Sequence, residues 1–123
     1  VYVWNRGDGL DEITMTGKTH VCEVKDGKIS TYDIDPHDYG FEYCTADVLK
    51  GGTPEENAKM TLDILTGKDK GARRNTVLLN AGCAIYCAGK AATIADGVKL
   101  AAEMIDSGKA YDKLNEMKDF TNS

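Results

Sequence analysis

The chain has 123 residues, of which 41% are hydrophobic and 28% are charged, and its formal net charge is −5. This length provides for one hydrophobic core, and this composition is that of an ordinary globular protein, which excludes intrinsic disorder. The longest uncharged stretch, residues 75–89, is too short to span a bilayer, and no basic leader followed by an apolar run opens the chain, so neither a membrane span nor a signal peptide is expected.

The first third of the chain is predicted to consist of strands and loops. In chain order these are a strand at residues 1–4, a Gly- and Asp-rich loop at 5–18, strands at 19–24 and 28–34, and an irregular segment at 37–44. Asp26-Gly27 joins the second and third strands and predicts a hairpin, because both central residues of a type I′ turn have positive φ. Pro36 cannot donate to a strand ladder, so it is predicted to end the third strand.

The rest of the chain is predicted to form four helices. Thr53, Pro54 and Glu56 are typical of a helix start with a capping box, and Gly67 is expected to end that helix. The next helix, residues 72–90, is apolar nearly all round and is predicted to be the buried central helix. Thr93 is expected to cap the third helix, and the fourth spans residues 110–120. The predicted core positions of the first, third and fourth helices are Ala58, Leu62, Leu65, Ile94, Val98, Ala101, Ala102, Ile105, Leu114 and Met117.

This order of elements predicts an α/β fold, with about three strands, including a hairpin, followed by four helices packed on the sheet. Three strands are thin cover for so apolar a central helix. In addition, a strand occupies residue 1 and no initiating Met precedes it. The expectation is therefore that the chain is the C-terminal portion of a larger α/β domain.

Acidic residues concentrate in the first half of the chain, where residues 1–65 carry a net charge of −7 against +2 for residues 66–123. The negative charge of residues 1–65 argues against binding to nucleic acid, whose phosphates need a basic surface, and it is consistent with cation binding or with solubility. Three carboxylates, those of Asp8, Asp11 and Glu12, fall within five residues of one loop that follows a strand. Neighbouring carboxylates suit hard divalent cations, and the open alternative is a solvated acidic turn.

Other polar features receive structural interpretations. The basic cluster at residues 68–74 precedes the central helix, whose free N–H groups could bind a phosphate, although a solvated loop is the favoured reading. Asn80 lies inside the apolar helix and is predicted to hydrogen-bond a neighbouring loop, because a buried amide needs a partner. His20 and His37 lack partners at catalytic or metal-ligand spacing and receive no role.

The four cysteines are Cys22, Cys44, Cys83 and Cys87. A chain of this length does not need disulfides for stability. Cys83 and Cys87 share one helix face and are interpreted as small core residues rather than metal ligands. Reduced cysteines predict a cytoplasmic location.

A series of short motifs spans essentially the whole chain. They are Asp8-Gly9-Leu10-Asp11-Glu12-Ile13-Thr14, the run through Thr19, Glu23-Val24 and Asp26-Gly27, then Gly51-Gly52, Glu56-Asn57-Ala58, Ile64-Leu65-Thr66-Gly67, Val77-Leu78-Leu79-Asn80-Ala81 and Ile105-Asp106-Ser107-Gly108-Lys109-Ala110. Together and in this order they resemble the anthranilate phosphoribosyltransferase family. Each motif alone is weak, but their common order is specific. The sequence departs from the family pattern at Asn5-Arg6, where a His-Gly pair is usual, and at Arg73-Arg74-Asn75, where Arg-Asp is common.

The resemblance implies a reaction, a metal and a set of partners. The family transfers ribose 5-phosphate from phosphoribosyl pyrophosphate to the amine of anthranilate in tryptophan biosynthesis, with Mg²⁺ offsetting the charge of the departing pyrophosphate. The family's Asp-Glu pair helps to hold that Mg²⁺, and the resemblance carries this role to Asp11 and Glu12. It also implies a homodimer for the intact enzyme and no nucleic-acid or membrane partner.

The resemblance further implies that residues 1–123 are an incomplete C-terminal part of the phosphoribosyltransferase α/β domain. The family's Gly-rich pyrophosphate loop, its anthranilate contacts and its N-terminal helical domain are expected upstream, so no catalytic residue is assigned here. This polypeptide alone is expected to be inactive, to bind Mg²⁺ weakly and to self-associate through exposed strand edges.

Two alternatives remain open at this point. One is a pyrimidine nucleoside phosphorylase of the same superfamily, which would use inorganic phosphate and would need no acidic metal loop. The other is a stand-alone module without catalytic activity. Asp11-Glu12 argues against the first, and the strand at residue 1 argues against the second.

Overall fold

The computed structural model describes the backbone of residues 2–4 and all of residues 9–123. The elements are β1 (Tyr2–Trp4), β2 (Thr19–Lys25), β3 (Lys28–Ile34), a 3-10 helix η1 (Pro36–Tyr39), α1 (Ala46–Leu49), α2 (Pro54–Leu65), α3 (Ala72–Cys87), α4 (Ile94–Asp106) and α5 (Lys109–Thr121). Among the described residues, no helix is both long enough and apolar enough to cross a bilayer.

The three strands form one antiparallel sheet in the order β1-β2-β3. Asp26 and Gly27 have φ values of 52° and 73°, so the predicted type I′ turn is confirmed. Strand β2 alternates in burial: Thr19, Val21 and Glu23 point inward, whereas most of β3 is exposed. The hairpin therefore covers the helices mainly through β2.

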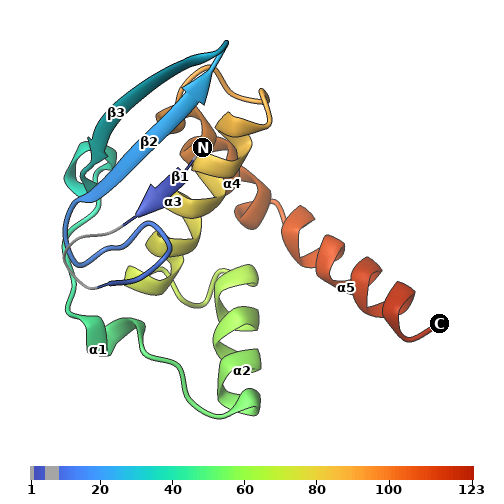
Figure 1. Ribbon diagram of the computed structural model, residues 1–123. Helices are drawn as coiled ribbons and strands as arrows, with labels where there is room; N and C mark the ends of the chain where they lie inside the picture. Colours follow the sequence, from blue (N-terminus) through green and yellow to red (C-terminus); the bar gives the residue numbers. More distant parts are fainter. Residues whose placement is uncertain (1, 5–8) are drawn as a thin grey trace.

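Helices α3 and α4 form the centre of the molecule (Figure 1). They cross with their backbones in contact at two glycines. A Cβ on Gly82 would lie 2.6 Å from the backbone nitrogen of Val98, and a Cβ on Gly97 would collide with the carbonyl oxygen of Gly82. Each glycine therefore costs helix propensity but permits the close crossing that fixes α3 against α4.

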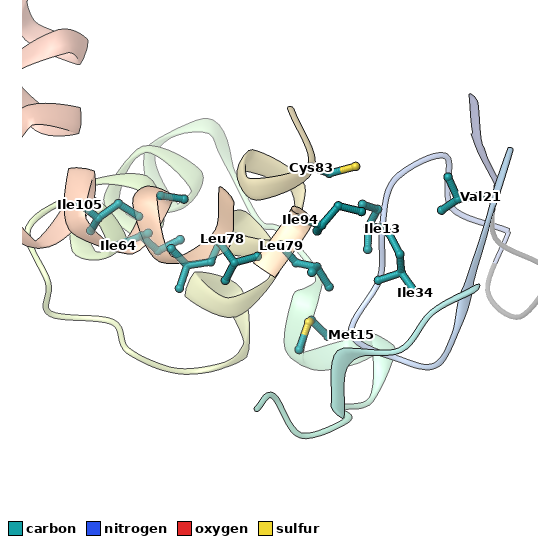
Figure 2. Close-up of a cluster of buried hydrophobic side chains, with 12 residues drawn as sticks. Ile13, Met15, Val21, Ile34, Ile64, Leu78, Leu79, Cys83, Ile94 and Ile105 are labelled. Carbon is teal, nitrogen blue, oxygen red and sulfur yellow. The ribbon is translucent and has the colours of Figure 1, made fainter. Parts of the chain in front are cut away.

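One hydrophobic core joins the loop before β2, the hairpin and the helices (Figure 2). Its members, all at most 9% exposed, are Ile13, Met15, Val21, Ile34, Ile64, Leu78, Leu79, Cys83, Ile94, Val98, Ala101 and Ile105. The predicted stripe of α4 is confirmed at Ile94, Val98, Ala101 and Ile105. The loop residues Ile13 and Met15 belong to this core as fully as the helices do.

The helix boundaries follow the predicted caps. In α2, Thr53 Oγ1 accepts a hydrogen bond from the N–H of Glu56 at 3.3 Å, and Glu56 Oε2 accepts one from the N–H of Thr53 at 2.7 Å. In α4, Thr93 Oγ1 accepts from the N–H of Asp96 at 3.1 Å. These bonds satisfy N–H groups that the first turn of a helix leaves free, which is why the local sequence fixes both starts.

The prediction of four helices packed on the sheet needs correction. Most of the helical core residues come from α3 and α4, α2 contributes Ile64, and none of the described residues of α5 is buried; α2 and α5 pack on other helices. Figure 1 shows α5 extending away from the rest of the molecule. Part of the segment predicted to be irregular forms η1, and α1 follows it as one further helical turn.

Several predicted core positions are exposed. Leu62 is 42% exposed because α2 turns Ile64 inward instead, and Met117 is 57% exposed because α5 extends beyond the body. The prediction that α3 is buried all round is wrong on one face, where Val77, Ala84 and Cys87 are exposed. None of the elements that the structure describes covers that face.

Candidate functional site

Asp11 and Glu12 lie together on the exposed part of the loop that precedes β2. They line an open cavity of about 330 Å³ with Ile13 and with Asn80, Cys83, Ala84 and Cys87 of α3. Within residues 9–123, neither carboxylate forms an ion pair with a basic side chain. The structure therefore brings the predicted pair to the exposed face of α3. The third predicted carboxylate, Asp8, lies outside the described residues.

Asn80 fastens this loop to α3. Its Oδ1 accepts a hydrogen bond from the backbone N–H of Ile13 at 3.0 Å, and its Nδ2 donates to the backbone carbonyl of Ile13 at 2.8 Å. The second Nδ2 hydrogen serves the carbonyl of Thr76, one helical turn back, at 2.9 Å. Asn80 is half-buried, and the predicted bond between its amide and a neighbouring loop is confirmed.

Two threonines fasten the same loop to the start of β2. Thr19 Oγ1 accepts a hydrogen bond from the N–H of Thr14 at 3.2 Å, and Thr14 Oγ1 accepts one from the N–H of Thr16 at 3.1 Å. Thr14 and Thr19 are at most 1% exposed, and the neighbouring Ile13 and Met15 are core residues (Figure 2). The backbone that directly follows the exposed acidic pair is therefore held by α3, through Asn80, and by the start of β2, through Thr19.

The donor set of this cavity suits a hard divalent cation. Carboxylate oxygens are the ligands that Mg²⁺ prefers, and it is commonly held by one or two carboxylates while water and substrate phosphates complete its octahedron. Within the described ranges, no three of the His, Cys, Asp and Glu side chains form a group able to enclose a metal ion. Burial raises the pKa of the Cys83 thiol to about 11, so it is neutral near pH 7.

The cysteine predictions hold in part. Cys83 is a core residue, but Cys87, four residues later, is exposed at the edge of the cavity. Cys22 and Cys44 are half-buried, and all four thiols are free. The sequence could not separate Cys83 from Cys87, because the difference depends on which side of α3 is covered.

The basic cluster before α3 has a structural role at one position. Arg74 is buried, and its guanidinium forms an ion pair with Asp106 near the end of α4, at 3.0 Å. At the start of α3, Asp69 Oδ1 accepts a hydrogen bond from the N–H of Gly71 at 2.8 Å. These contacts join α3 to α4 and hold the turn before it, so they favour the structural interpretation over a phosphate site.

Both histidines lie beside carboxylates. His20 Nδ1 lies 2.7 Å from Asp33 Oδ1 across the hairpin, where the two residues are register partners. His37 lies near Asp35 and Glu42, and its ring centroid is 4.1 Å from that of Tyr43. Neither histidine lines the cavity of the acidic pair.

A buried carboxylate that received no prediction lies between the hairpin and α3. Glu23 is 7% exposed, and it accepts hydrogen bonds from the hydroxyls of Tyr86 at 2.7 Å and Tyr32 at 2.9 Å. These two bonds, that of Tyr86 first, lower the pKa of Glu23, and burial together with Glu23 raises the pKa of Tyr32 well above its usual value. The sequence held a signal for this burial. Alternate residues of a strand point to the same face, so Glu23 is expected on the inward face of β2 with Thr19 and Val21.

Comparison with known proteins places this geometry in context. The family model described as "Glycosyl transferase family, a/b domain" matches residues 1–111. An anthranilate phosphoribosyltransferase of Methanobrevibacter smithii is 53% identical over 116 residues, which cover 94% of this chain and 34% of that protein. The chain thus spans about a third of the length of the curated relatives that it matches.

Solved structures give the same match. The crystal structure of the anthranilate phosphoribosyltransferase of Thermus thermophilus superposes with a TM-score of 0.85 at 38% identity, covering 95% of this chain and 34% of that one. The enzyme of Saccharomyces cerevisiae, in complex with PRPP and Mg, superposes with a TM-score of 0.78 at 29% identity, covering 92% and 32%. The same yeast enzyme has been solved in complex with 4-fluoroanthranilate.

Proposed function

The chain belongs to the glycosyl transferase family, within its a/b domain, and is a homologue of the anthranilate phosphoribosyltransferases; from this we propose that it is the C-terminal third of such an enzyme. The intact protein transfers ribose 5-phosphate from phosphoribosyl pyrophosphate to anthranilate, in tryptophan biosynthesis. Identity of 53% over nearly the whole chain supports this enzyme rather than a phosphorylase of the same superfamily.

In this reaction the bond between the ribose C1 and the pyrophosphate oxygen breaks, and a bond from C1 to the anthranilate nitrogen forms. The amine loses one proton, and pyrophosphate leaves with the bonding electron pair. Positive charge develops on the ribose ring while negative charge grows on pyrophosphate. Bound Mg²⁺ supplies the counter-charge for that leaving group.

Asp11 and Glu12 are the residues proposed to hold this Mg²⁺. The observation that supports the proposal is an adjacent, exposed carboxylate pair without a basic partner among the described residues, at the edge of a cavity of about 330 Å³. The pair supplies two ligands, which leaves coordination positions for the phosphates of the substrate. The yeast relative, solved with PRPP and Mg, is the precedent for this combination.

The domain assignment is part of the proposal. Residues 1–123 form the C-terminal part of the phosphoribosyltransferase α/β domain, and the remaining strands and the helical domain are upstream in the intact protein. The exposed face of α3, with Val77 and Ala84, supports an incomplete layer at this point. The isolated chain is therefore expected to show no turnover, and its exposed edges favour self-association.

The intact enzyme is proposed to be a cytoplasmic homodimer. The four free thiols of this chain support a reducing compartment. Proposed partners are the small molecules anthranilate and phosphoribosyl pyrophosphate.

A chimera provides the test. The chain replaces the matching third of the Methanobrevibacter smithii enzyme, and turnover of anthranilate is followed with phosphoribosyl pyrophosphate and Mg²⁺. The unaltered segment is expected to support turnover. Asp11→Asn and Glu12→Gln are each expected to lower it by more than about 100-fold, since even indirect changes around a metal cost about 10- to 100-fold.

Asp26→Asn is the matched control, because it removes the same charge at the exposed hairpin turn. It is expected to leave turnover unchanged. Turnover that survives both changes in the acidic pair would contradict the metal assignment. A soluble, folded chimera with the unaltered segment that shows no turnover of anthranilate would contradict the assignment of this chain to the enzyme.

A further inference from the structure

The side-chain amide of Asn80 holds a segment of the loop before β2 in addition to meeting its own need for hydrogen-bond partners. Both backbone polar groups of Ile13 are bound by this one side chain, at 3.0 and 2.8 Å, although the two residues are 67 positions apart in the sequence. Ile13 directly follows the acidic pair. We infer that Asn80 is a positioning residue for the proposed magnesium site, setting where Asp11 and Glu12 lie relative to α3; the inference rests on the proposed function.

The peptide geometry shows how the constraint reaches Glu12. The N–H of Ile13 and the carbonyl of Glu12 belong to one planar peptide unit, which also contains the Cα of Glu12. A hydrogen bond that fixes this plane therefore fixes the Cα from which the Glu12 side chain projects. The carboxylate is left only its own rotatable bonds.

The next peptide plane is held at both ends. Its carbonyl, that of Ile13, accepts from Asn80 Nδ2, and its N–H, that of Thr14, donates to Thr19 Oγ1 at 3.2 Å. Two consecutive planes are thus fixed, one from α3 alone and one from α3 and β2 together. Ile13 is 2% exposed, so these backbone groups have little access to water if Asn80 is removed.

The amide has one orientation that satisfies this arrangement. Oδ1 accepts from one N–H, while the two Nδ2 hydrogens serve the carbonyls of Ile13 and Thr76. A flipped amide would place Nδ2 against an N–H and Oδ1 against two carbonyls. The bond to Thr76 holds the amide against its own helix, so the position of Ile13 is set relative to the backbone of α3.

This arrangement matches a general requirement of metal sites. Groups behind the ligands hold them in place, and the removal of such a group costs about 10- to 100-fold in metal affinity or activity. Asn80 also lines the cavity of the acidic pair, and the backbone that it holds, that of Ile13, directly follows the pair. If the role of Asn80 were only structural, its replacement would lower the stability of the fold, but the folded protein would bind the Mg²⁺ complex of the substrate with unchanged affinity.

Two variants separate the bonds. Asn80→Ala removes all three, whereas Asn80→Asp keeps an acceptor for the N–H of Ile13 but turns an oxygen toward the carbonyls of Ile13 and Thr76. Tyr86→Phe is the matched control, because it removes one part-buried hydrogen bond from the same helix, that to Glu23, and leaves the bonds of Asn80 to the loop in place. Each variant is made in the chimera described above.

The first measurement needs no metal. Amide hydrogen exchange over residues 9–16 is compared among the folded variants. Asn80→Ala is expected to speed exchange at Ile13, and Tyr86→Phe is expected to leave it unchanged. The second measurement is the calorimetric dissociation constant of phosphoribosyl pyrophosphate at saturating Mg²⁺, which is expected to rise about tenfold in both Asn80 variants. The KM for anthranilate is expected to stay within twofold of its original value.

The outcomes keep the inference apart from the proposed function. If Asp11→Asn and Glu12→Gln weaken binding of the Mg²⁺ complex but the Asn80 variants do not, the inference is overturned and the proposed function stands. An equal loss in Tyr86→Phe also overturns it, because the effect would then follow general stability. If the acidic-pair variants bind the Mg²⁺ complex normally, the metal assignment within the proposed function fails, and the inference about Asn80 fails with it.

Discussion

The chain carries carboxylates in two contrasting environments beside the same helix, α3. Glu23 is buried between the hairpin and α3, and two tyrosine hydroxyls bind it. Asp11 and Glu12 are exposed at the edge of a cavity, and neither forms an ion pair within the described ranges. In the first region the side chain is satisfied internally, whereas in the second only the backbone is fixed.

The contrast separates a structural carboxylate from one available to a ligand. A carboxylate with internal donors has its charge compensated, so removing it costs stability. A carboxylate without donors, on rigid backbone, costs the fold little and can bind a cation from solution. Replacing Glu23 should therefore lower the stability of the fold, whereas replacing Asp11 or Glu12 should weaken ligand binding and leave the stability nearly unchanged.

The largest effect is expected at the helix crossing on which both regions depend. Gly97→Ala places a methyl group against the carbonyl oxygen of Gly82, and the backbone of α4 must move. The free energy of unfolding is expected to fall by about 3 kcal/mol, measured by urea denaturation. Gly17→Ala is the control, since no atom lies within 4 Å of the added Cβ and φ is not positive there; an equal loss in both would contradict the account of the crossing.

Loss of the buried carboxylate comes next. Glu23→Ala leaves the hydroxyls of Tyr32 and Tyr86 without their acceptor. The expected loss of unfolding free energy is about 2 kcal/mol, since a hydrogen bond to a charged group contributes roughly 1.5–3 kcal/mol. Urea denaturation measures it, and Glu42→Ala, at an exposed position, is the comparison. A loss no greater than that of the Glu42 variant would show that Glu23 is not structural.

Acidification sharpens the same distinction. The pKa of Glu23 is lower in the folded state than its ordinary value of 4.5, because of the hydrogen bonds from Tyr86 and Tyr32. The unfolded chain therefore binds this proton more readily, and the stabilisation is present above about pH 4.5 and lost as the pH falls through the folded pKa. The melting temperature of Glu23→Gln is expected to fall less between pH 6 and pH 3 than that of the original chain, and equal falls would contradict this.

The smallest effect on stability is expected in the acidic pair. Asp11→Asn and Glu12→Gln remove exposed charges without internal partners among the described residues. The free energy of unfolding should change by less than about 0.5 kcal/mol in each variant. Thermal denaturation measures this, and a clear loss would mean that these carboxylates hold the loop rather than a ligand.

Local features of the fold were predictable from sequence because neighbouring residues determine them. The turn depends on the adjacent residues Asp26 and Gly27, and the capping box depends on Thr53 and Glu56, which are three positions apart. The bond made by Asn80 was predictable in kind, since an amide in an apolar helix needs a partner, although the sequence does not identify Ile13 as that partner.

Long-range features were not predictable in the same way. The apolar character of α3 predicts burial on every side, but only contacts between distant elements show that Val77 and Ala84 face outward. Met117 has the spacing of a core residue, yet α5 leaves the body before reaching it. The bonds of Glu23 depend on Tyr86, which is 63 positions away.

The central claim is that Asp11 and Glu12 bind Mg²⁺ together with the substrate phosphates. The direct measurement is calorimetry of phosphoribosyl pyrophosphate binding to the chimera, with and without Mg²⁺, for the original segment and for the double variant Asp11→Asn/Glu12→Gln. Mg²⁺ is expected to strengthen binding to the original segment, and this increment is expected to vanish in the double variant while Asp26→Asn retains it. An increment of the same size in the double variant would contradict the account.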